Sequence, residues 1–290
     1  MKNRLKKITF LLAIITSGIA SAQVQMNFEF DEPYGNNKEV GKYATINGAK
    51  IYFEEYGVGE PLFLIHGNGA SINSMGNQIE YFKANYRVII ADNRGHGKSE
   101  LKTDSLTYVQ IADDWNGLAA HLKLDSVNII GWSDGGIIGL LMGISKQVKM
   151  KKLIAMGANL RPDSSAVYSW AVNDVERQRQ IVALKIKEND ISENWILQKQ
   201  IIGLLGDQPS ILVSDLSKIK VPVLIISGDK DIIREEHSIE MYQNIPNAQL
   251  CIMPGETHYS PASNPELFNT IANRFLSEPF KRPDSDWTKW

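Results

Sequence analysis

The stretch Gly131-Trp132-Ser133-Asp134-Gly135-Gly136 follows a short apolar run, residues 127–130, and precedes a segment with helical spacing. Glycines on both sides of Ser133 favour a sharp turn in which the backbone leaves no room for a Cβ atom. Two interpretations fit: a nucleophilic serine on a strained strand-to-helix turn, or an ordinary connection that contains a serine. The pattern alone is weak, because Gly and Ser are common residues. The surrounding sequence decides between them.

Short apolar runs recur on both sides of this turn and alternate with helical patterns. Six are predicted as strands: residues 62–65, 87–91, 127–130, 152–156, 223–226 and 250–253. Continuous apolar runs of this length suit parallel strands that are covered on both faces. A hairpin is also predicted at residues 43–56, where Asn47-Gly48 is a strong turn signal. The sequence therefore predicts an α/β fold with a mostly parallel, doubly wound sheet of about eight strands.

One interval breaks the alternation. Residues 161–220 carry no strand signal and are rich in Gln, Glu, Lys and Asn, with aliphatic residues at helical spacing. They predict a small helical lid, inserted before the last two strands of a core that comprises residues 43–160 and 221–278. Residues 23–42 are predicted as a loosely packed lead-in and residues 279–290 as a polar tail.

The first 22 residues have the three parts of a secretory signal peptide. A basic start is followed by the apolar residues 8–15, and Ala20-Ser21-Ala22 forms a cleavage site before Gln23. The apolar run is far shorter than the roughly 20 residues that a membrane span needs. The sequence therefore predicts an exported chain, periplasmic or extracellular, that begins at Gln23 and has no stable membrane insertion.

The composition argues against several classes of function. The chain has 31 Lys and Arg against 33 Asp and Glu, and without a long basic or acidic block nothing indicates nucleic-acid binding. Cys251 is the only cysteine, so an intramolecular disulfide is impossible, and its apolar neighbours predict a buried strand position. The five histidines show no metal-ligand spacing. No cofactor or metal is predicted, and the expected partner is a small-molecule substrate.

A serine becomes a nucleophile when a base takes its proton and a carboxylate orients that base. His258 follows the predicted strand at residues 250–253, where such a base is expected. His121 and His237 are predicted at the surface of helices, and His96 lies in a loop held by its own hydrogen bonds. His258 is therefore the candidate base.

The carboxylate is expected in the loop after the predicted strand at residues 223–226. This loop contains two candidates, Asp229 and Asp231. Either one gives the chain order serine, aspartate, histidine. The residues by themselves leave both open.

Backbone N–H groups are needed to hold the negative oxygen that forms when a serine attacks a carbonyl group. One is predicted at Asp134, directly after Ser133 and at the positive end of the following helix. The other is predicted at Asn68, in the turn after residues 62–65, where Gly67 and Gly69 let the backbone approach a substrate. The alternative for this second stretch is an ordinary strand-to-helix turn.

Five ordered stretches make the chain resemble the α/β-hydrolase superfamily over most of residues 43–277. They are His66-Gly67-Asn68-Gly69, Asp92-Asn93-Arg94-Gly95-His96-Gly97-Lys98-Ser99, Gly131-Trp132-Ser133-Asp134-Gly135-Gly136, Gly228-Asp229-Lys230-Asp231 and Gly255-Glu256-Thr257-His258. The resemblance implies the α/β-hydrolase fold, with Ser133 as nucleophile and His258 as base. Members usually place the acid three residues after the glycine of the strand-end turn, which favours Asp231 over Asp229.

The predicted function is a secreted serine hydrolase that cleaves a small carboxylic ester, thioester, lactone or amide through an acyl-enzyme. The alternative is a non-hydrolytic use of the fold, as a cofactor-free lyase, a perhydrolase or a ligand-binding protein. The side chains of the lid, which the sequence does not orient, determine the substrate.

The side chain of Asp134 has two interpretations. It can favour the start of a helix, or it can hold the amine of an α-amino acid ester. The second is implied by Gly131–Gly136 and Gly157-Ala158-Asn159, which are similar to valacyclovir hydrolase and biphenyl hydrolase-like enzymes. Trp132 is a further candidate substrate contact.

Overall fold

The computed structural model describes residues 28–289. The predicted signal peptide lies outside these residues. Eight strands form one sheet in the order β1-β2-β4-β3-β5-β6-β7-β8. Their bounds are β1 Lys42–Ile46, β2 Ala49–Tyr56, β3 Glu60–Ile65, β4 Tyr86–Ala91, β5 Val127–Trp132, β6 Met150–Met156, β7 Val223–Lys230 and β8 Ala248–Thr257. β1, β2 and β4 pair antiparallel, and β4, β3 and β5 to β8 pair parallel, which confirms the predicted mostly parallel sheet.

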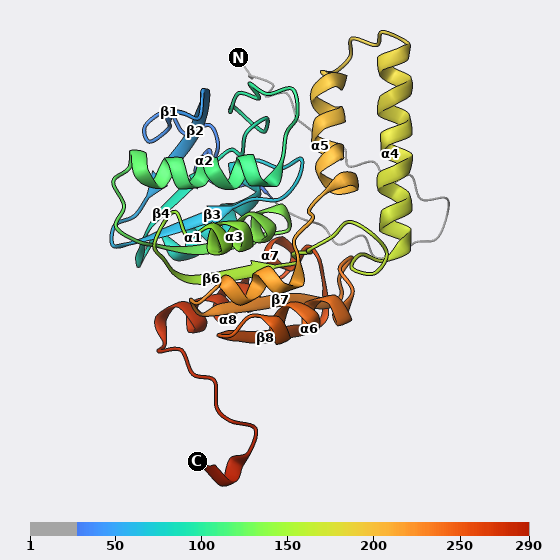
Figure 1. Ribbon diagram of the computed structural model, residues 1–290. Helices are drawn as coiled ribbons and strands as arrows, with labels where there is room; N and C mark the ends of the chain where they lie inside the picture. The colour runs from blue at the N-terminus through green and yellow to red at the C-terminus, as the bar shows by residue number, and fades with distance from the viewer. Residues whose placement is uncertain (1–27, 290) are drawn as a thin grey trace.

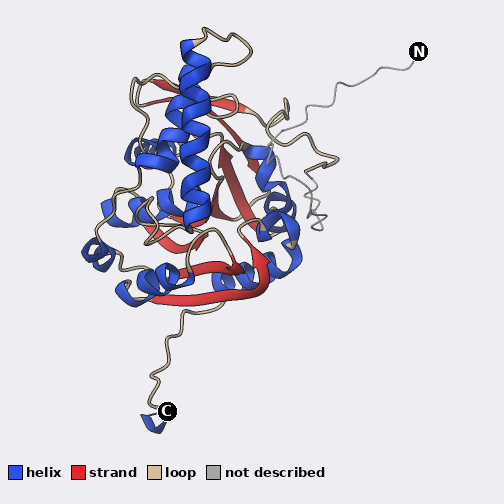
Figure 2. Cartoon of the chain, turned by 90° about the vertical axis from the view of Figure 1, so that its right-hand side faces the viewer, coloured by secondary structure: helices blue, strands red, loops and turns tan. Residues whose placement is uncertain are grey.

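Helices cover both faces of this sheet (Figures 1 and 2). They are α1 Gly76–Phe82, α2 Tyr108–His121, α3 Asp134–Ser145, α4 Ser169–Lys187, α5 Trp195–Asp207, α6 Glu235–Asn244, α7 Ser260–Ser263 and α8 Pro265–Ser277, with short 3-10 helices η1 Ile72–Met75, η2 Val213–Lys218 and η3 Trp287–Lys289. The burial of both faces explains why the central strands read as continuous apolar runs.

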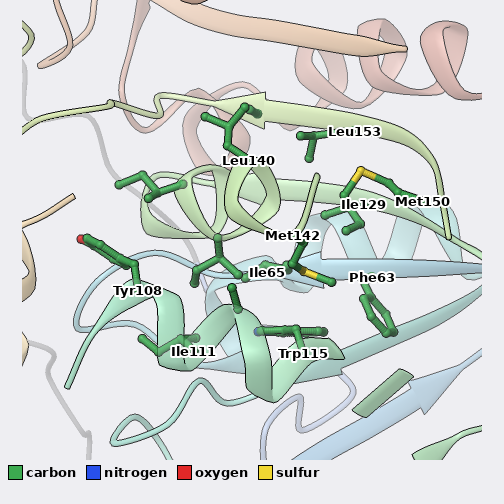
Figure 3. Close-up of a cluster of buried hydrophobic side chains, with 14 of the residues drawn as sticks. Phe63, Ile65, Tyr108, Ile111, Trp115, Ile129, Leu140, Met142, Met150 and Leu153 are labelled. Carbon is green, nitrogen blue, oxygen red and sulfur yellow. The ribbon is translucent and has the colours of Figure 1, made fainter. Parts of the chain in front are cut away.

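Alternate residues of each central strand enter two different hydrophobic clusters. On β3, Phe63 and Ile65 pack with α2 and α3 (Figure 3), whereas Leu62 and Leu64 pack with α1 and α8. This follows from the two-residue period of a strand, which sends successive side chains to opposite faces. The sheet is thereby fixed between two packed layers, and the ends of its strands are held in place.

The interval predicted as a lid contains α4 and α5, and these two helices are called the lid below. α4 and α5 form a pair of upright helices beside the sheet (Figure 1). The last residues of the predicted lid interval belong to the core instead. Leu216 of η2 and Ile219 are fully buried in the hydrophobic cluster that contains α2 and α3. From η2 onward, the chain packs with the core rather than with the two upright helices.

The described part of the lead-in is packed more tightly than the sequence predicts. Tyr34 is buried, and the backbone N–H groups of Gly35 and Asn37 donate to the carboxylate of Glu54 on β2 at 2.8 and 3.1 Å. Glu54 itself is fully buried. A buried carboxylate needs such donors, so this polar segment is part of the fold.

Two other predictions concern Cys251 and the polar tail at residues 279–290. Cys251 lies on β8 as predicted but is only partly buried. The tail extends away from the body (Figure 1), and Trp287 is exposed there. Between residues 28 and 289, no helix is both long and apolar enough to cross a membrane.

Candidate active site

Ser133 lies on the turn between β5 and α3 and has positive φ, with φ 59° and ψ −120°. This conformation is strained for a residue with a side chain. A Cβ atom at Gly131 would lie 2.1 Å from the carbonyl oxygen of Gly135, and one at Gly135 would lie 2.0 Å from that of Ile65. The glycines on both sides of Ser133 are therefore sterically required by the turn.

The structure brings the predicted serine, histidine and aspartate together. His258 Nε2 lies 2.9 Å from Ser133 Oγ, and His258 Nδ1 lies 2.7 Å from Asp231 Oδ1. Asp231 also accepts a hydrogen bond from the backbone N–H of Ile233 at 3.1 Å. With the Nδ1 proton donated to Asp231, Nε2 is free to accept the hydroxyl proton of Ser133. The side chain of Ser133 remains partly exposed, whereas His258 and Asp231 are buried.

Asp229, the other candidate acid, has a different contact. Its Oδ1 accepts a hydrogen bond from the backbone N–H of Gly255 at 2.9 Å. β7 and β8 extend past the predicted strands, and Lys230 pairs with Thr257 at their far ends. This pairing sets the loops that carry Asp231 and His258 side by side, while Asp229 serves the turn at Gly255.

Two residues next to His258 determine how closely its loop approaches the sheet, Trp132 by a hydrogen bond and Gly157 by its lack of a side chain. Trp132 is 5% exposed, and its indole Nε1 donates to the carbonyl oxygen of His258 at 2.7 Å. Gly157 has a φ of 61°, and a Cβ atom there would lie 2.6 Å from His258 Cε1. The structure thus places Trp132, predicted as a substrate contact, where it supports the loop of His258.

Asn68 and Asp134, the two predicted oxyanion donors, lie next to each other. The side-chain nitrogen of Asn68 donates to Asp134 Oδ2 at 2.9 Å and to the carbonyl oxygen of Ile201, in α5, at 3.1 Å. Asp134 begins α3, so its backbone N–H is at the positive end of that helix. The side chain of Asn68 therefore contacts both the turn between β5 and α3, called the serine turn below, and helix α5 of the lid.

The carboxylate of Asp134 is 2% exposed and has a second partner, Tyr108, whose hydroxyl donates to Oδ1 at 2.8 Å. Burial raises the pKa of Asp134 to about 6, although the hydrogen bonds from Asn68 and Tyr108 favour the charged form. Tyr108 was not predicted at the site. It begins α2, far from Ser133 in the sequence, and nothing local indicates that its hydroxyl reaches Asp134.

The remaining histidines lie mostly inside the molecule. His66 and His96 are buried, and burial lowers the pKa of each to about 4. His96 Nδ1 lies 3.0 Å from the carbonyl oxygen of Arg94, within its own loop, in agreement with the prediction. His121 is exposed, also as predicted.

The prediction of a surface position for His237 is wrong. Its side chain is buried, and Nε2 accepts a hydrogen bond from the backbone N–H of Leu160 at 2.9 Å. Burial lowers its pKa. The partner follows β6, at the base of the lid, so the burial depends on a tertiary contact that helix periodicity does not reveal. In the part of the chain that the structure describes, no three His, Cys, Asp or Glu residues are grouped in a way that could hold a metal ion.

Known proteins with similar sequences also point to the α/β-hydrolase fold. Residues 60–192 match the sequence profile of the family described as alpha/beta hydrolase fold. A putative non-heme chloroperoxidase of Synechocystis sp. is 28% identical over 267 residues, covering 80% of this chain and 96% of that protein. The serine hydrolase BPHL of Homo sapiens is 26% identical over 259 residues, covering 84% and 88%.

Solved structures share the fold over most of the chain. MGS-M2, an alpha/beta hydrolase enzyme from a Medee basin deep-sea metagenome library, has a TM-score of 0.72 at 18% identity and covers 84% of this chain and 100% of its own. Similar proteins and structures include esterases, lactonases and other hydrolases. The profile match, the sheet order and the five ordered motifs show that this chain has the α/β-hydrolase fold.

Proposed function

We propose that the protein is a serine hydrolase that cleaves small carboxylic esters, thioesters, lactones or amides through an acyl-enzyme on Ser133. One observation carries the proposal: Asp231, His258 and Ser133 form a continuous hydrogen-bonded series, with distances of 2.7 and 2.9 Å. A serine, a base and an orienting carboxylate in this arrangement are what nucleophilic attack on an acyl group requires.

Each residue has a defined role in the reaction. Ser133 Oγ attacks the carbonyl carbon of the substrate while His258 Nε2 takes the hydroxyl proton, and Asp231 stabilises the resulting imidazolium. The carbonyl oxygen becomes negative and accepts hydrogen bonds from the backbone N–H groups of Asn68 and Asp134. Collapse of this intermediate expels the leaving group, which receives the proton from His258, and leaves the acyl group on Ser133.

Deacylation repeats these steps with water. His258 takes a proton from the water as its oxygen attacks the acyl carbon, and then returns the proton to Ser133 Oγ as the carboxylic acid leaves. Apart from the substrate and water, every group named in these steps belongs to this chain.

An α-amino acid ester is the finer proposal for the substrate. The carboxylate of Asp134 adjoins Ser133, and its two hydrogen-bond partners, Tyr108 and Asn68, are both neutral. Among the described residues it has no ion-pair partner, and burying an unpaired charge is costly. The ammonium group of an amino ester would supply the missing cation.

Export through the signal peptide at residues 1–22 is proposed from the sequence alone. Intact-mass analysis of the protein from its native host should find a chain that begins at Gln23, with or without cyclisation of that residue to pyroglutamate. A cytoplasmic protein that retains residues 1–22 would contradict the proposal.

The test of the hydrolase itself is a substrate panel of simple esters, lactones and aminoacyl esters, applied to the purified mature chain. Replacing Ser133 or His258 with alanine should lower kcat by about 10⁴-fold or more, with the circular dichroism spectrum unchanged. The serine mechanism is refuted if Ser133→Ala retains substantial turnover. The panel also identifies the acyl and leaving groups that the wild type prefers.

A further inference from the structure

Both hydrogen atoms of the Asn68 side-chain amide are used, and they go to two different elements. One hydrogen bond reaches Asp134 Oδ2 on the serine turn at 2.9 Å, and the other reaches the carbonyl oxygen of Ile201 in the middle of α5 at 3.1 Å. An amide nitrogen has two donors and no more. The Asn68 side chain is therefore a direct bridge between the active-site turn and a helix of the lid.

A second route links α5 to the same carboxylate. Gln200 of α5 accepts from the backbone N–H of Leu106 at 2.8 Å, and Gln208, directly after α5, accepts from that of Tyr108 at 3.2 Å. The hydroxyl of Tyr108 in turn donates to Asp134 Oδ1 at 2.8 Å. The contacts close a ring that passes through α5, the loop before α2, Asp134 and Asn68.

The turn that carries Asn68 is held at its start, where Gly67 is buried and its carbonyl oxygen lies 2.8 Å from His66 Nδ1 and 3.4 Å from the backbone nitrogen of Ala70, but it is less constrained at Gly69. Gly67 and Gly69 flank it, and Gly69 is exposed, with a φ of 64° and no atom within 4 Å of a Cβ built there. A turn between two glycines has many accessible backbone conformations. The hydrogen bonds of the Asn68 side chain restrict these conformations and keep Asn68 beside Asp134.

We propose that the side chain of Asn68 is a positioning residue that couples lid helix α5 to the oxyanion donors, so that a displaced lid weakens transition-state stabilisation. The inference rests on the proposed hydrolase function and deepens it. It assigns a role to the amide side chain, distinct from the oxyanion donor proposed at the backbone N–H of the same residue. It also explains why both carboxylate oxygens of Asp134 accept hydrogen bonds: one joins Asp134 to Asn68 and the other joins it to Tyr108.

The first test compares an ester with the matching thionoester, in which sulfur replaces the carbonyl oxygen. Donors aimed at a negative oxygen favour the ester over its thiono analogue, so the ratio of the two kcat/KM values reports on donor placement. Asn68→Ala keeps the backbone N–H but should lower this ratio by about tenfold. The matched control is Asn73→Ala, which removes an amide that donates to Phe28 outside the ring, and it should leave the ratio unchanged.

The second test changes only the contacts that Gln200 and Gln208 make with the segment at Leu106 and Tyr108. The double variant Gln200→Ala/Gln208→Ala, which leaves every residue of the turn intact, should lower the ester-to-thionoester ratio in the same direction. Combined with Asn68→Ala it should produce no further fall, because the changes act through one path. Gln180→Ala, on the exposed face of α4, is the control. An unchanged ratio in Asn68→Ala, or additive effects in the combined variant, would overturn the proposal.

Amide hydrogen exchange separates this inference from the hydrolase proposal, because it needs no turnover. The Gln200→Ala/Gln208→Ala variant should exchange faster than wild type at residues 66–71, although these residues are far away in the sequence. Protection of residues 66–71 that is identical in both proteins shows that the lid does not hold the turn, whether or not the wild type hydrolyses esters. Inactivity of the wild type on the whole panel, in contrast, counts against the hydrolase proposal.

Discussion

Asp229 and Asp231 are only two residues apart, yet their carboxylates have different contacts in the structure. Asp231 lies 2.7 Å from His258 Nδ1, and Asp229 accepts a hydrogen bond from Gly255 N at 2.9 Å. Asp231→Asn should lower kcat by up to about 10⁴-fold, because the amide stabilises the wrong form of the imidazole. Asp229→Asn should cost less than tenfold. Steady-state kinetics on one good ester measures both, and the reverse order would show that Asp229 is the acid.

Asp134 offers a test of substrate class. A partly desolvated charge pair with an ammonium group is worth about 1.5–3 kcal/mol, which is about 10- to 150-fold in kcat/KM. The wild type should therefore prefer an α-amino ester to its des-amino analogue, and Asp134→Asn should abolish the preference. Equal loss on both substrates, or no preference in the wild type, would show that the carboxylate serves only the protein.

The pKa of about 6 for Asp134 adds a pH dependence to this preference. Above pH 6 the carboxylate is charged and can pair with an ammonium group, and below pH 6 it becomes protonated and the pair is lost. The ratio of amino to des-amino kcat/KM should therefore fall as the pH drops from 7 to 5. Because the ratio compares two substrates on one enzyme, pH effects that are common to both substrates cancel.

The sequence predicted Ser133 and His258, because each follows a strand signal and the chain order of the motifs is distinctive. Tyr108 and the burial of His237 could not be predicted this way. The contacts of both, with Asp134 and with the backbone of Leu160, join elements that are distant in the sequence. Local patterns describe the element that a residue belongs to, and contacts between elements depend on the packed fold.

At the scale of the element, the turn from β5 to α3 depends on glycine. A Cβ atom at Gly135 would lie 2.0 Å from the backbone oxygen of Ile65, so Gly135→Ala must push β3 and α3 apart. This overpacking should lower the free energy of unfolding by about 1–3 kcal/mol or more and reduce activity. Gly203→Ala in α5 is the matched control, since its Cβ would meet only Asp207 Oδ2 at 3.6 Å. The control should be neutral or stabilise the helix by up to about 1 kcal/mol, as urea unfolding can show.

The central strands and main helices could be predicted because their apolar runs and helical spacing are long. The end of the lid could not, because η2 is short and its burial comes from contact with the cluster around α2 and α3. The lead-in was missed for a related reason. Its polar composition suggests loose packing, but the buried carboxylate of Glu54 accepts its backbone N–H groups.

At the scale of the whole molecule, buried neutral histidines link stability to pH. Burial lowers the pKa of His96 from 6.5 to about 4, so between these values the unfolded chain binds the proton and the folded chain does not. The contribution of His96 to stability is therefore lost as the pH falls below about 6.5. His96→Leu removes this pH dependence. As the pH falls through this interval, the free energy of unfolding of the variant should therefore rise relative to that of the wild type by about 1.4 kcal/mol per pH unit. Urea unfolding from pH 7.5 to 4.5 measures the difference, and parallel curves for the two proteins would contradict the assignment.

The central claim is that Ser133, activated by His258, forms a covalent acyl-enzyme. Its most direct test is reaction with a fluorophosphonate, in which the serine oxygen displaces fluoride from phosphorus, followed by mass spectrometry of the intact protein and its peptides. The wild type should gain one adduct, on the peptide that contains Ser133. Ser133→Ala should gain none, and His258→Ala should react at least about 10³-fold more slowly. A folded wild-type protein that stays unlabelled, or that carries the adduct on another residue, would contradict the account.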